Sequence, residues 1–338
     1  MAITDGIQQI GADFGHGGTG SSDKLKMFLV KFSGQVLTAF DRANVTQNRH
    51  TIRSIENGKA ASFPVLGRTS ARKLEAGASL DEGRKRIEGT QKIINIDGLL
   101  VSDVLIADIE DAMNHFDVRA EYTKQLGEAL AISYDCSVLA EIAKACNLTG
   151  GAEQNLNGLG KPVTFKVKEE GKATLLGKPE ELGKLMMQYL AKAQAKLNTQ
   201  YVPQGERYFY CEPEVYAAIS ASLLPTNANF ASLANAETGV LKNIFGFEII
   251  QVPHLSNGGI GHVFPSNGTG TGSTVVGKDN VLGLFMHRSA IGTVKLKDLA
   301  IEHARRAELQ ADMIVAKYSM GHGLLRPEAL GCLVANGA

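Results

Sequence analysis

Residues 108–147, DIEDAMNHFDVRAEYTKQLGEALAISYDCSVLAEIAKACN, are the longest stretch of the chain with one consistent apolar pattern. Apolar side chains recur there at helical spacing, and the stretch contains no proline and a single glycine, Gly127. We therefore predict one continuous helix of about 35 to 40 residues. Its length, over about 50 Å, exceeds the diameter of a small globular domain. Such a helix predicts a flat, elongated molecule organised along one spine.

The segment before this helix, residues 51–106, is predicted to be a long two-stranded excursion. TIRSI (51–55), SFPVLG (62–67) and KIINIDGLLV (92–101) have the composition of strands, and a polar, glycine-interrupted stretch lies between the last two. That stretch is basic, with Arg84, Lys85 and Arg86 in succession. Because an exposed two-stranded hairpin is marginally stable by itself, this one needs a surface to lie on.

The N-terminal residues are predicted to be an arm. Residues 1–22 contain six glycines, two acidic residues and no Lys or Arg, which is typical of a flexible segment. From Asp23, a suitable N-cap, residues 23–40 place apolar side chains at helical spacing. An amphipathic helix of about four turns is therefore expected after the arm.

The C-terminal half alternates between strand and helix patterns. PVTFKVK (162–168), the start of RYFYCEPEVYAAISASLL (207–224), FGFEIIQVPHL (245–255) and DNVLGLFMHRSAIGTVKL (279–296) are predicted strands. Helices are expected over residues 179–198 and from Pro213, and residues 307–335 are predicted to form a long strand, a turn and a final strand. The whole is typical of a mixed α+β fold with a central sheet.

Composition excludes several classes of protein. The chain has 35 Lys and Arg residues and 35 Asp and Glu residues, so it lacks the basic excess of a protein that grips nucleic acid tightly. No apolar run approaches the roughly 20 residues that cross a bilayer, and the first residues do not resemble a signal peptide. Four cysteines without CxxC spacing, Cys136, Cys146, Cys211 and Cys332, are expected to be small buried thiols in a reducing compartment.

The sequence patterns that could indicate a catalytic or ligand-binding site are incomplete. Gly15, Gly17 and Gly20 match a dinucleotide-binding pattern, but no hydrophobic strand precedes them. Asp111 and His115 are spaced for a shared metal, yet no third ligand follows nearby, so a surface pair is favoured. No other common catalytic, phosphate, zinc or calcium motif occurs. We predict no catalytic residue, no cofactor and no metal.

Two clusters of charged residues in the sequence can be explained without a catalytic or binding role. The acidic cluster could act as general acid and base if its carboxylates were paired in a cleft. A helix dipole also favours acidic residues at a helix start, and we prefer this explanation. A second cluster could face DNA or a partner, although a solvated or intersubunit face is favoured. The acidic cluster is Asp103, Asp108, Glu110 and Asp111, and the basic one is His287, Arg288, His303, Arg305, Arg306 and His322.

Several long motifs together resemble the major capsid proteins of T7-like short-tailed phages (the podovirus or autographivirus type). The resemblance covers nearly the whole chain. The motifs are FPVLGRT (63–69), INIDGLL (94–100), DIEDAMNHFDVRAEYTKQLGE (108–128), VLAEIA (138–143), FGFEIIQVPHL (245–255), KDNVLGLFMHRSAIGTVKLKDLAIE (278–302) and MGHGLLRPEALG (320–331). Residues 150–178 and 256–277, both glycine-rich, depart from the family pattern, so the resemblance predicts the fold but not the surface loops in these two stretches.

The resemblance implies the HK97-type capsid fold, an α+β fold with five parts. These are an N-terminal arm (1–50), an extended loop (51–106), a peripheral domain with the spine helix (107–185), an axial domain (186–299), and a return strand that completes the peripheral domain (300–338). The parts predicted from the residues alone occur in the same order.

The resemblance also implies a function and a set of partners. Copies of the chain would form hexamers and pentamers of an icosahedral head around double-stranded DNA, which they would contact weakly and non-specifically. A scaffolding protein would assist assembly, and a portal protein would replace one pentamer at one vertex. The protein would be made and assembled in the host bacterial cytoplasm, end in the virion, and contact no membrane.

Two hypotheses on assembly follow. The basic hairpin, around Arg84, Lys85 and Arg86, would cross a neighbouring copy and meet the acidic start of its spine helix, around Asp108, Glu110 and Asp111. The glycine-rich arm and the 256–277 loop would become ordered only against neighbours, because glycine loses the most entropy on ordering.

Two alternatives stay open at this point. An encapsulin-like cellular compartment would share the fold but enclose a cargo enzyme. An enzyme would need titratable residues that converge in a pocket, and the sequence indicates none.

Overall fold

The computed structural model shows the architecture of most of the chain. It describes residues 7–8, 44–67, 69–75, 77, 79, 87, 89–96, 98–107, 119–146, 160–167, 171–226, 234–235, 240–241, 243–255 and 280–335. Every structural statement below concerns these residues.

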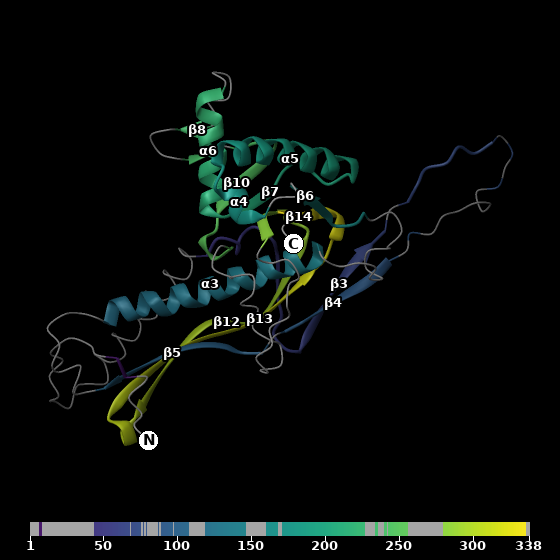
Figure 1. Ribbon diagram of the computed structural model, residues 1–338. Coiled ribbons are helices and arrows are strands. Elements are labelled where there is room, and N and C mark those ends of the chain that lie inside the picture. The colour runs from purple at the N-terminus through teal and green to yellow at the C-terminus, as the bar shows by residue number, and fades with distance from the viewer. Residues whose placement is uncertain are drawn as a thin grey trace.

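The described elements follow one another as strands, a long helix, and then alternating strands and helices (Figure 1). The strands are β1 (Ile7–Gln8), β2 (Thr51–Ser54), β3 (Ala60–Leu66), β4 (Gly89–Asn95), β5 (Leu100–Ala107), β6 (Val163–Lys166), β7 (Arg207–Cys211), β8 (Ala234–Asn235), β9 (Val240–Leu241), β10 (Phe247–Gln251), β11 (Val281–His287), β12 (Ile291–Arg306), β13 (Ala311–Leu324) and β14 (Leu330–Val334). The helices are α3 (Arg119–Cys146), α4 (Lys172–Leu176), α5 (Pro179–Thr199) and α6 (Pro213–Thr226).

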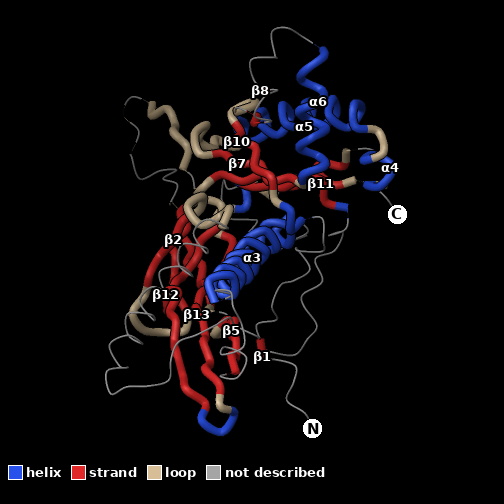
Figure 2. Tube along the Cα trace, turned by 90° about the vertical axis from the view of Figure 1, so that its left-hand side faces the viewer, coloured by secondary structure: helices blue, strands red, loops and turns tan. Residues whose placement is uncertain are grey.

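Two five-stranded sheets form the frame of the molecule, where the sequence predicted one central sheet. The first sheet has the order β1-β5-β13-β12-β2, and the second has the order β10-β7-β11-β14-β6. In Figure 2 the first sheet lies along α3, and the second lies beside α5 and α6. Strand patterns alone do not show which strands pair, and for this reason the sequence did not distinguish one sheet from two.

One long pair of antiparallel strands passes through both sheets. β11 pairs with β14 in the second sheet, and after short connections β12 pairs with β13 in the first. At the crossing, the backbone N–H groups of Leu325 and Arg326 both donate to the carbonyl of Ala290, at 2.8 and 3.1 Å. The two sheets are therefore joined by continuous backbone and hydrogen bonds.

Helix α3 is the spine of the molecule, as the sequence predicted. It ends at Cys146, one residue before the predicted end, while residues 108–118 of the predicted helix lie outside the described residues. The 28 residues of α3 span about 42 Å at 1.5 Å per residue. It is buried on more than one side, because it contacts β5 and β13 of the first sheet and β11 and β14 of the second.

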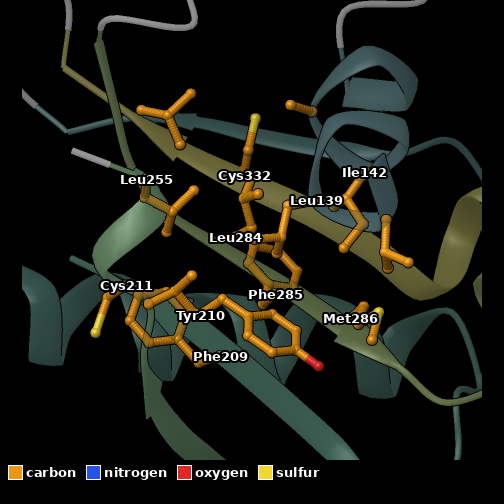
Figure 3. Packing of buried hydrophobic residues seen from close by; sticks show 14 of the residues in the cluster. Leu139, Ile142, Phe209, Tyr210, Cys211, Leu255, Leu284, Phe285, Met286 and Cys332 are labelled. Atoms are coloured by element: carbon orange, nitrogen blue, oxygen red, sulfur yellow. The ribbon is translucent and has the colours of Figure 1, made fainter. Parts of the chain in front are cut away.

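A single apolar core extends from α3 into both sheets. In Figure 3, Leu139 and Ile142 of α3 lie next to the β11 strand that carries Leu284 and Phe285, with Phe209 of β7 beyond. All five side chains are at most 1% exposed. Burial of side chains of this size contributes about 1.5–3 kcal/mol each, so the contact of the helix with the second sheet is mainly apolar.

The predicted strand at residues 92–101 was wrong, because the chain turns inside it. β4 ends at Asn95 and β5 begins at Leu100, and the two strands belong to different sheets. Gly98 lies in the turn with φ +57°, a backbone conformation that glycine adopts without steric cost. The Asp-Gly dipeptide at 97–98 was the sequence signal for this turn, inside an otherwise continuous apolar run.

Strand β12 is longer than the sequence predicted. The predicted strand ended at residue 296, but β12 continues to Arg306 and reverses through Ala307–Leu309 into β13. Its outer part is polar, so an apolar pattern could not reveal it. Cross-strand charge pairs accompany it instead, among them Lys317 with Glu302, and Arg305 Nη1 with Asp312 Oδ1 at 3.0 Å.

Most other predicted elements are confirmed. The strands predicted in residues 51–55, 62–67, 162–168 and 245–255 and the helices at 179–198 and from Pro213 are present, with ends shifted by a few residues. The five predicted parts of the chain stay a prediction. The boundary at 185/186 falls within α5, and the boundary at 299/300 falls within β12.

The root of the β3–β4 hairpin packs closely against two glycines of β13. The root buries Ala61, Phe63 and Ile94 against β12. A Cβ atom at Gly321 would lie 2.1 Å from the carbonyl oxygen of Asn95, and one at Gly323 would lie 2.8 Å from Cγ1 of Ile94. The ribbon can lie so close to the first sheet only because these positions have no side chain.

We expect Gly321→Ala to displace the root of the hairpin. The added methyl group would collide with backbone, so the substitution should lower the free energy of unfolding by about 1–3 kcal/mol and increase hydrogen exchange in β3 and β4. Urea titration and exchange mass spectrometry would measure both effects. Gly205→Ala is the matched control, since no atom lies within 4 Å of a Cβ there. Equal stability of the two variants would contradict the close packing.

Candidate functional site

Residues 44–54, which we call the clasp, connect the chain's N-terminal region to the rest of the fold. The clasp begins with a side-chain turn, in which Asn44 Oδ1 accepts hydrogen bonds from the N–H groups of Thr46 at 3.0 Å and Gln47 at 2.8 Å. It ends as β2, which pairs in parallel with residues 292–295 of β12. The clasp therefore adds the last strand to the first sheet.

A buried carboxylate on the spine helix holds the clasp. Asp135 of α3 is 0% exposed and accepts hydrogen bonds from Val45 N at 2.8 Å, Thr46 N at 3.0 Å and Thr46 Oγ1 at 2.6 Å. Hydrogen bonds to a charged acceptor are stronger than neutral ones, and a buried carboxylate without them would be costly. Asp135 thus joins the clasp to the middle of the spine helix.

A buried histidine, His50, and a partly buried one, His322, continue this polar contact into the first sheet. His50 Nδ1 lies 2.8 Å from the carbonyl of Thr46, so this nitrogen is the donor. Its Nε2 is then the acceptor, 2.7 Å from Thr293 Oγ1 and 3.0 Å from the Tyr134 hydroxyl. Thr293 Oγ1 is also 2.8 Å from His322 Nδ1. We call Thr46, His50, Tyr134, Asp135, Thr293 and His322 the polar junction.

Burial keeps the histidines of the junction neutral. Desolvation lowers the pKa of His50 from its ordinary value of 6.5 to about 4, against a smaller opposing effect of Asp135. Desolvation, together with the nearby His50, lowers the pKa of His322 to about 3. Burial also raises the pKa of the Tyr134 hydroxyl, so all three groups are uncharged near neutral pH.

The clasp also reaches the second sheet. Arg49 Nη2 lies 2.8 Å from Glu248 Oε1 of β10, and the guanidinium lies over the ring of Tyr208 of β7, 5.6 Å from its centroid. Both side chains of the ion pair are partly exposed, so this pair contributes about 0–1 kcal/mol. One short segment thus contacts the spine helix and both sheets.

The β3–β4 hairpin presents an apolar face to solvent. Its buried face includes Ala61, Phe63 and Val65, while Leu66 and Ile93 lie on the opposite face and are 66% and 58% exposed. Figure 1 shows the ribbon projecting from the side of the molecule. Large exposed apolar side chains on a projecting ribbon indicate a surface that another molecule covers.

The predicted intersubunit residues cannot be placed. Arg84, Lys85, Arg86, Asp108, Glu110 and Asp111 all lie outside the described residues, so their contact stays a prediction. The predicted acidic cluster at the helix start is wrong in one member. Asp103 lies in β5, where it is paired with Val315 of β13.

The predicted basic cluster is not one patch. His322 is partly buried in the polar junction, and Arg288 Nη1 lies 2.7 Å from Glu206 Oε1 next to the second sheet. Arg305 lies far along the first sheet near the reversal into β13, where it pairs with Asp312. Residues close in the sequence are separated here because extended strands carry them away from one another.

Sequence reasoning missed the polar junction. Two signals were present: a lone Asp135 within the apolar run ISYDCSVL, and His322 between two glycines. Neither shows which distant residue is its partner. Within the described residues, no three His, Cys, Asp or Glu side chains are grouped as metal ligands would be.

The described helices do not have the features of membrane spans. None in the described part of the chain combines the length and the apolar character that a span requires.

Comparison with known proteins gives a consistent result. A family model described as Gp10A-like, major capsid protein, matches residues 62–334. The chain is 54% identical to the major capsid protein of Escherichia phage T7 over 99% of both chains, and 52% identical to that of Enterobacteria phage T3 over 99% of this chain and 98% of the other. The fold is similar to the capsid structure of cyanophage P-SCSP1u, with TM-score 0.71, 28% identity, and coverage of 87% of this chain and 89% of that one.

We expect stability to depend on pH through the two histidines. Both have a lower pKa in the folded than in the unfolded chain, so their contribution is complete above pH 6.5 and is lost as the pH falls toward about 4. For His50 this loss corresponds to about 3 kcal/mol. Urea titrations across this range should show less pH dependence for His50→Gln and His322→Gln than for the parent. Equal pH dependence in all three proteins would refute the assignment.

Proposed function

Because the chain belongs to the family of major capsid proteins of T7-like phages, we propose that it builds the icosahedral head of its phage as hexamers and pentamers. The protein is a structural component of the virion and not an enzyme, and its copies assemble into a capsid lattice with one another. The observation that carries the proposal is the 54% identity over 99% of both chains to the major capsid protein of phage T7. Membership in a phage family also argues against the encapsulin-like alternative.

The shape of the subunit supports assembly into a thin shell. The fold is elongated along α3, and the β3–β4 ribbon projects to one side (Figure 1). The apolar side chains Leu66 and Ile93 remain exposed on this ribbon and would be covered in a closed lattice. Burial of such side chains releases water and favours association without a directional bond.

We further propose three partners in addition to the chain itself. A scaffolding protein guides assembly in the host cytoplasm, a portal protein occupies one vertex, and packaged double-stranded DNA contacts the wall weakly and non-specifically. Equal numbers of basic and acidic residues support the last point, since phosphate binding requires an excess of positive charge. A wall that bound DNA tightly would hinder its movement during packaging.

The hairpin is the element that we propose to reach a neighbouring copy. Arg84, Lys85 and Arg86 would meet Asp108, Glu110 and Asp111 of the neighbour's spine helix. Since each exposed ion pair contributes about 0–1 kcal/mol, charge would set the register, while apolar side chains such as Leu66 and Ile93 hold the contact. Individually weak contacts also let wrongly placed copies dissociate.

Electron microscopy tests the proposed assembly. We expect the purified protein to form shells, and we expect those shells to become uniform icosahedral particles when the scaffolding protein of the same phage is present. Image classification would show fivefold and sixfold capsomers. Small discrete oligomers under every condition, with no shells or curved sheets, would contradict the proposal.

Charge reversal tests the hairpin contact. Replacing Arg84, Lys85 and Arg86 together with Glu should prevent shell formation and leave the melting transition of the free subunit unchanged. Reversing Asp108, Glu110 and Asp111 to Lys in the same chain should restore shells, because the attraction is then regained with opposite sign. Normal particles from the first variant, or no rescue by the second, would refute this pairing.

A further inference from the structure

Two thiols meet where the end of α3 lies against the second sheet. Cys146 is the last residue of α3, and Cys332 lies in β14, in register with Thr164 of the parallel strand β6. The thiols of Cys146 and Cys332 are hydrogen bonded to each other. In Figure 3, Cys332 projects from β14 beside the helix that carries Leu139 and Ile142.

Thr164 holds both cysteines in this arrangement. Cys332 Sγ donates to Thr164 Oγ1 at 3.6 Å, and the Thr164 hydroxyl donates to the carbonyl of Cys146 at 3.1 Å. Together with the hydrogen bond between the two thiols, these contacts link Cys146, Thr164 and Cys332 in a ring. The sulfur atoms are therefore kept next to each other by one strand register and one helix end, not by chance contact of mobile side chains.

The other two cysteines differ from this pair. Cys136 and Cys211 are buried, and burial raises the pKa of each thiol, so both have the character of small apolar side chains. Cys146 keeps part of its surface exposed, and all four thiols are free in the structure. Two neighbouring thiols, one of them in a partly exposed residue, are suited to a reaction that an isolated buried thiol cannot undergo.

We propose that Cys146 and Cys332 form a disulfide when the protein meets an oxidising solution. The bond would tie the end of the spine helix to the last strand of the second sheet. Because the two thiols already form a hydrogen bond, the bond would close between neighbouring sulfur atoms.

The oxidant is a low-molecular-weight disulfide. The Cys146 thiol loses its proton, attacks a sulfur of the small disulfide and expels one small thiolate. Cys332 then attacks Cys146 Sγ in this mixed disulfide and expels the second thiolate. The released protons convert both thiolates to thiols, two protein thiols are oxidised, and one small disulfide is reduced. The hydrogen bond that Cys146 donates lowers the pKa of Cys332, which favours ionisation of the second attacking thiol, while the same hydrogen bond and burial raise the pKa of Cys146, so the first attack is the slow step.

The biological role of this disulfide rests on the proposed function, although the reaction that forms it does not. A capsid subunit is made in a reducing cytoplasm, where the thiols stay free, and the particle then leaves the cell. A disulfide that closes only outside would not interfere with assembly. It would join α3 to the second sheet after the particle is complete.

Peptide mass spectrometry of the full chain tests this inference. Purified protein is exposed to oxidised glutathione, the reaction is stopped with acid, the remaining thiols are alkylated in denaturant, and the protein is digested without reductant. We expect a cross-linked peptide pair that contains Cys146 and Cys332 and has lost two hydrogen atoms. The pair should be abundant in the parent and in the control Cys211→Ser, and absent from Cys146→Ser and Cys332→Ser.

The outcomes separate this inference from the proposed function. Both cysteines alkylated in the parent, or carrying only glutathione, would overturn it, and this result does not depend on whether either serine variant folds. Electron microscopy of the same sample reports shell formation independently. A cross-link without shells would contradict the proposed function alone, and shells without a cross-link would contradict the disulfide alone.

Discussion

The buried carboxylate of Asp135 is the interaction on which the arrangement of the other parts depends. It accepts three hydrogen bonds from the clasp, and the clasp supplies the edge strand of the first sheet, the contact of His50 with β12, and the ion pair with the second sheet. A charge at 0% exposure would be strongly unfavourable without these donors. These hydrogen bonds therefore fix the position of the clasp on the spine helix.

The projecting β3–β4 hairpin has a closely packed root and an outer face whose apolar side chains are exposed. At the root, glycines of β13 let the ribbon lie directly on the first sheet, and Ile94 is 2% exposed. Farther out, Leu66 and Ile93 face solvent. A fixed root aims the ribbon in one direction, and the exposed face leaves free energy to be gained only when a neighbour covers it. This division suits a subunit that must be stable alone and adhesive in a lattice.

The strands β11 to β14 give the subunit its mechanical continuity. They pair with each other through both sheets, so a force applied to either sheet is carried along backbone and not across a loose linker. α3 covers the same crossing with buried apolar side chains from its centre to its end. A subunit that forms part of a closed wall benefits from this construction, because its two sheets cannot separate without losing the hydrogen bonds to the carbonyl of Ala290 and the apolar contacts of α3.

The sequence by itself determined the local elements and, through long motifs, the family. The period of the apolar residues revealed α3 and α5, Pro213 marked the start of α6, and the charge balance argued against tight DNA binding. These features depend on neighbours within a few residues, so they can be read from the chain directly. The turn at Gly98 and the polar end of β12 were missed, because a continuous apolar run concealed one and a lack of apolar residues concealed the other.

Only the tertiary structure decided which distant residues meet. No sequence pattern predicts the contacts of Asp135 with Thr46, His50 with Thr293, and Cys146 with Cys332. Division of the strands into two sheets likewise depends on pairing across the whole chain. The physical reason is that secondary structure follows local periodicity, whereas burial of a polar group requires a specific partner that long-range packing alone supplies.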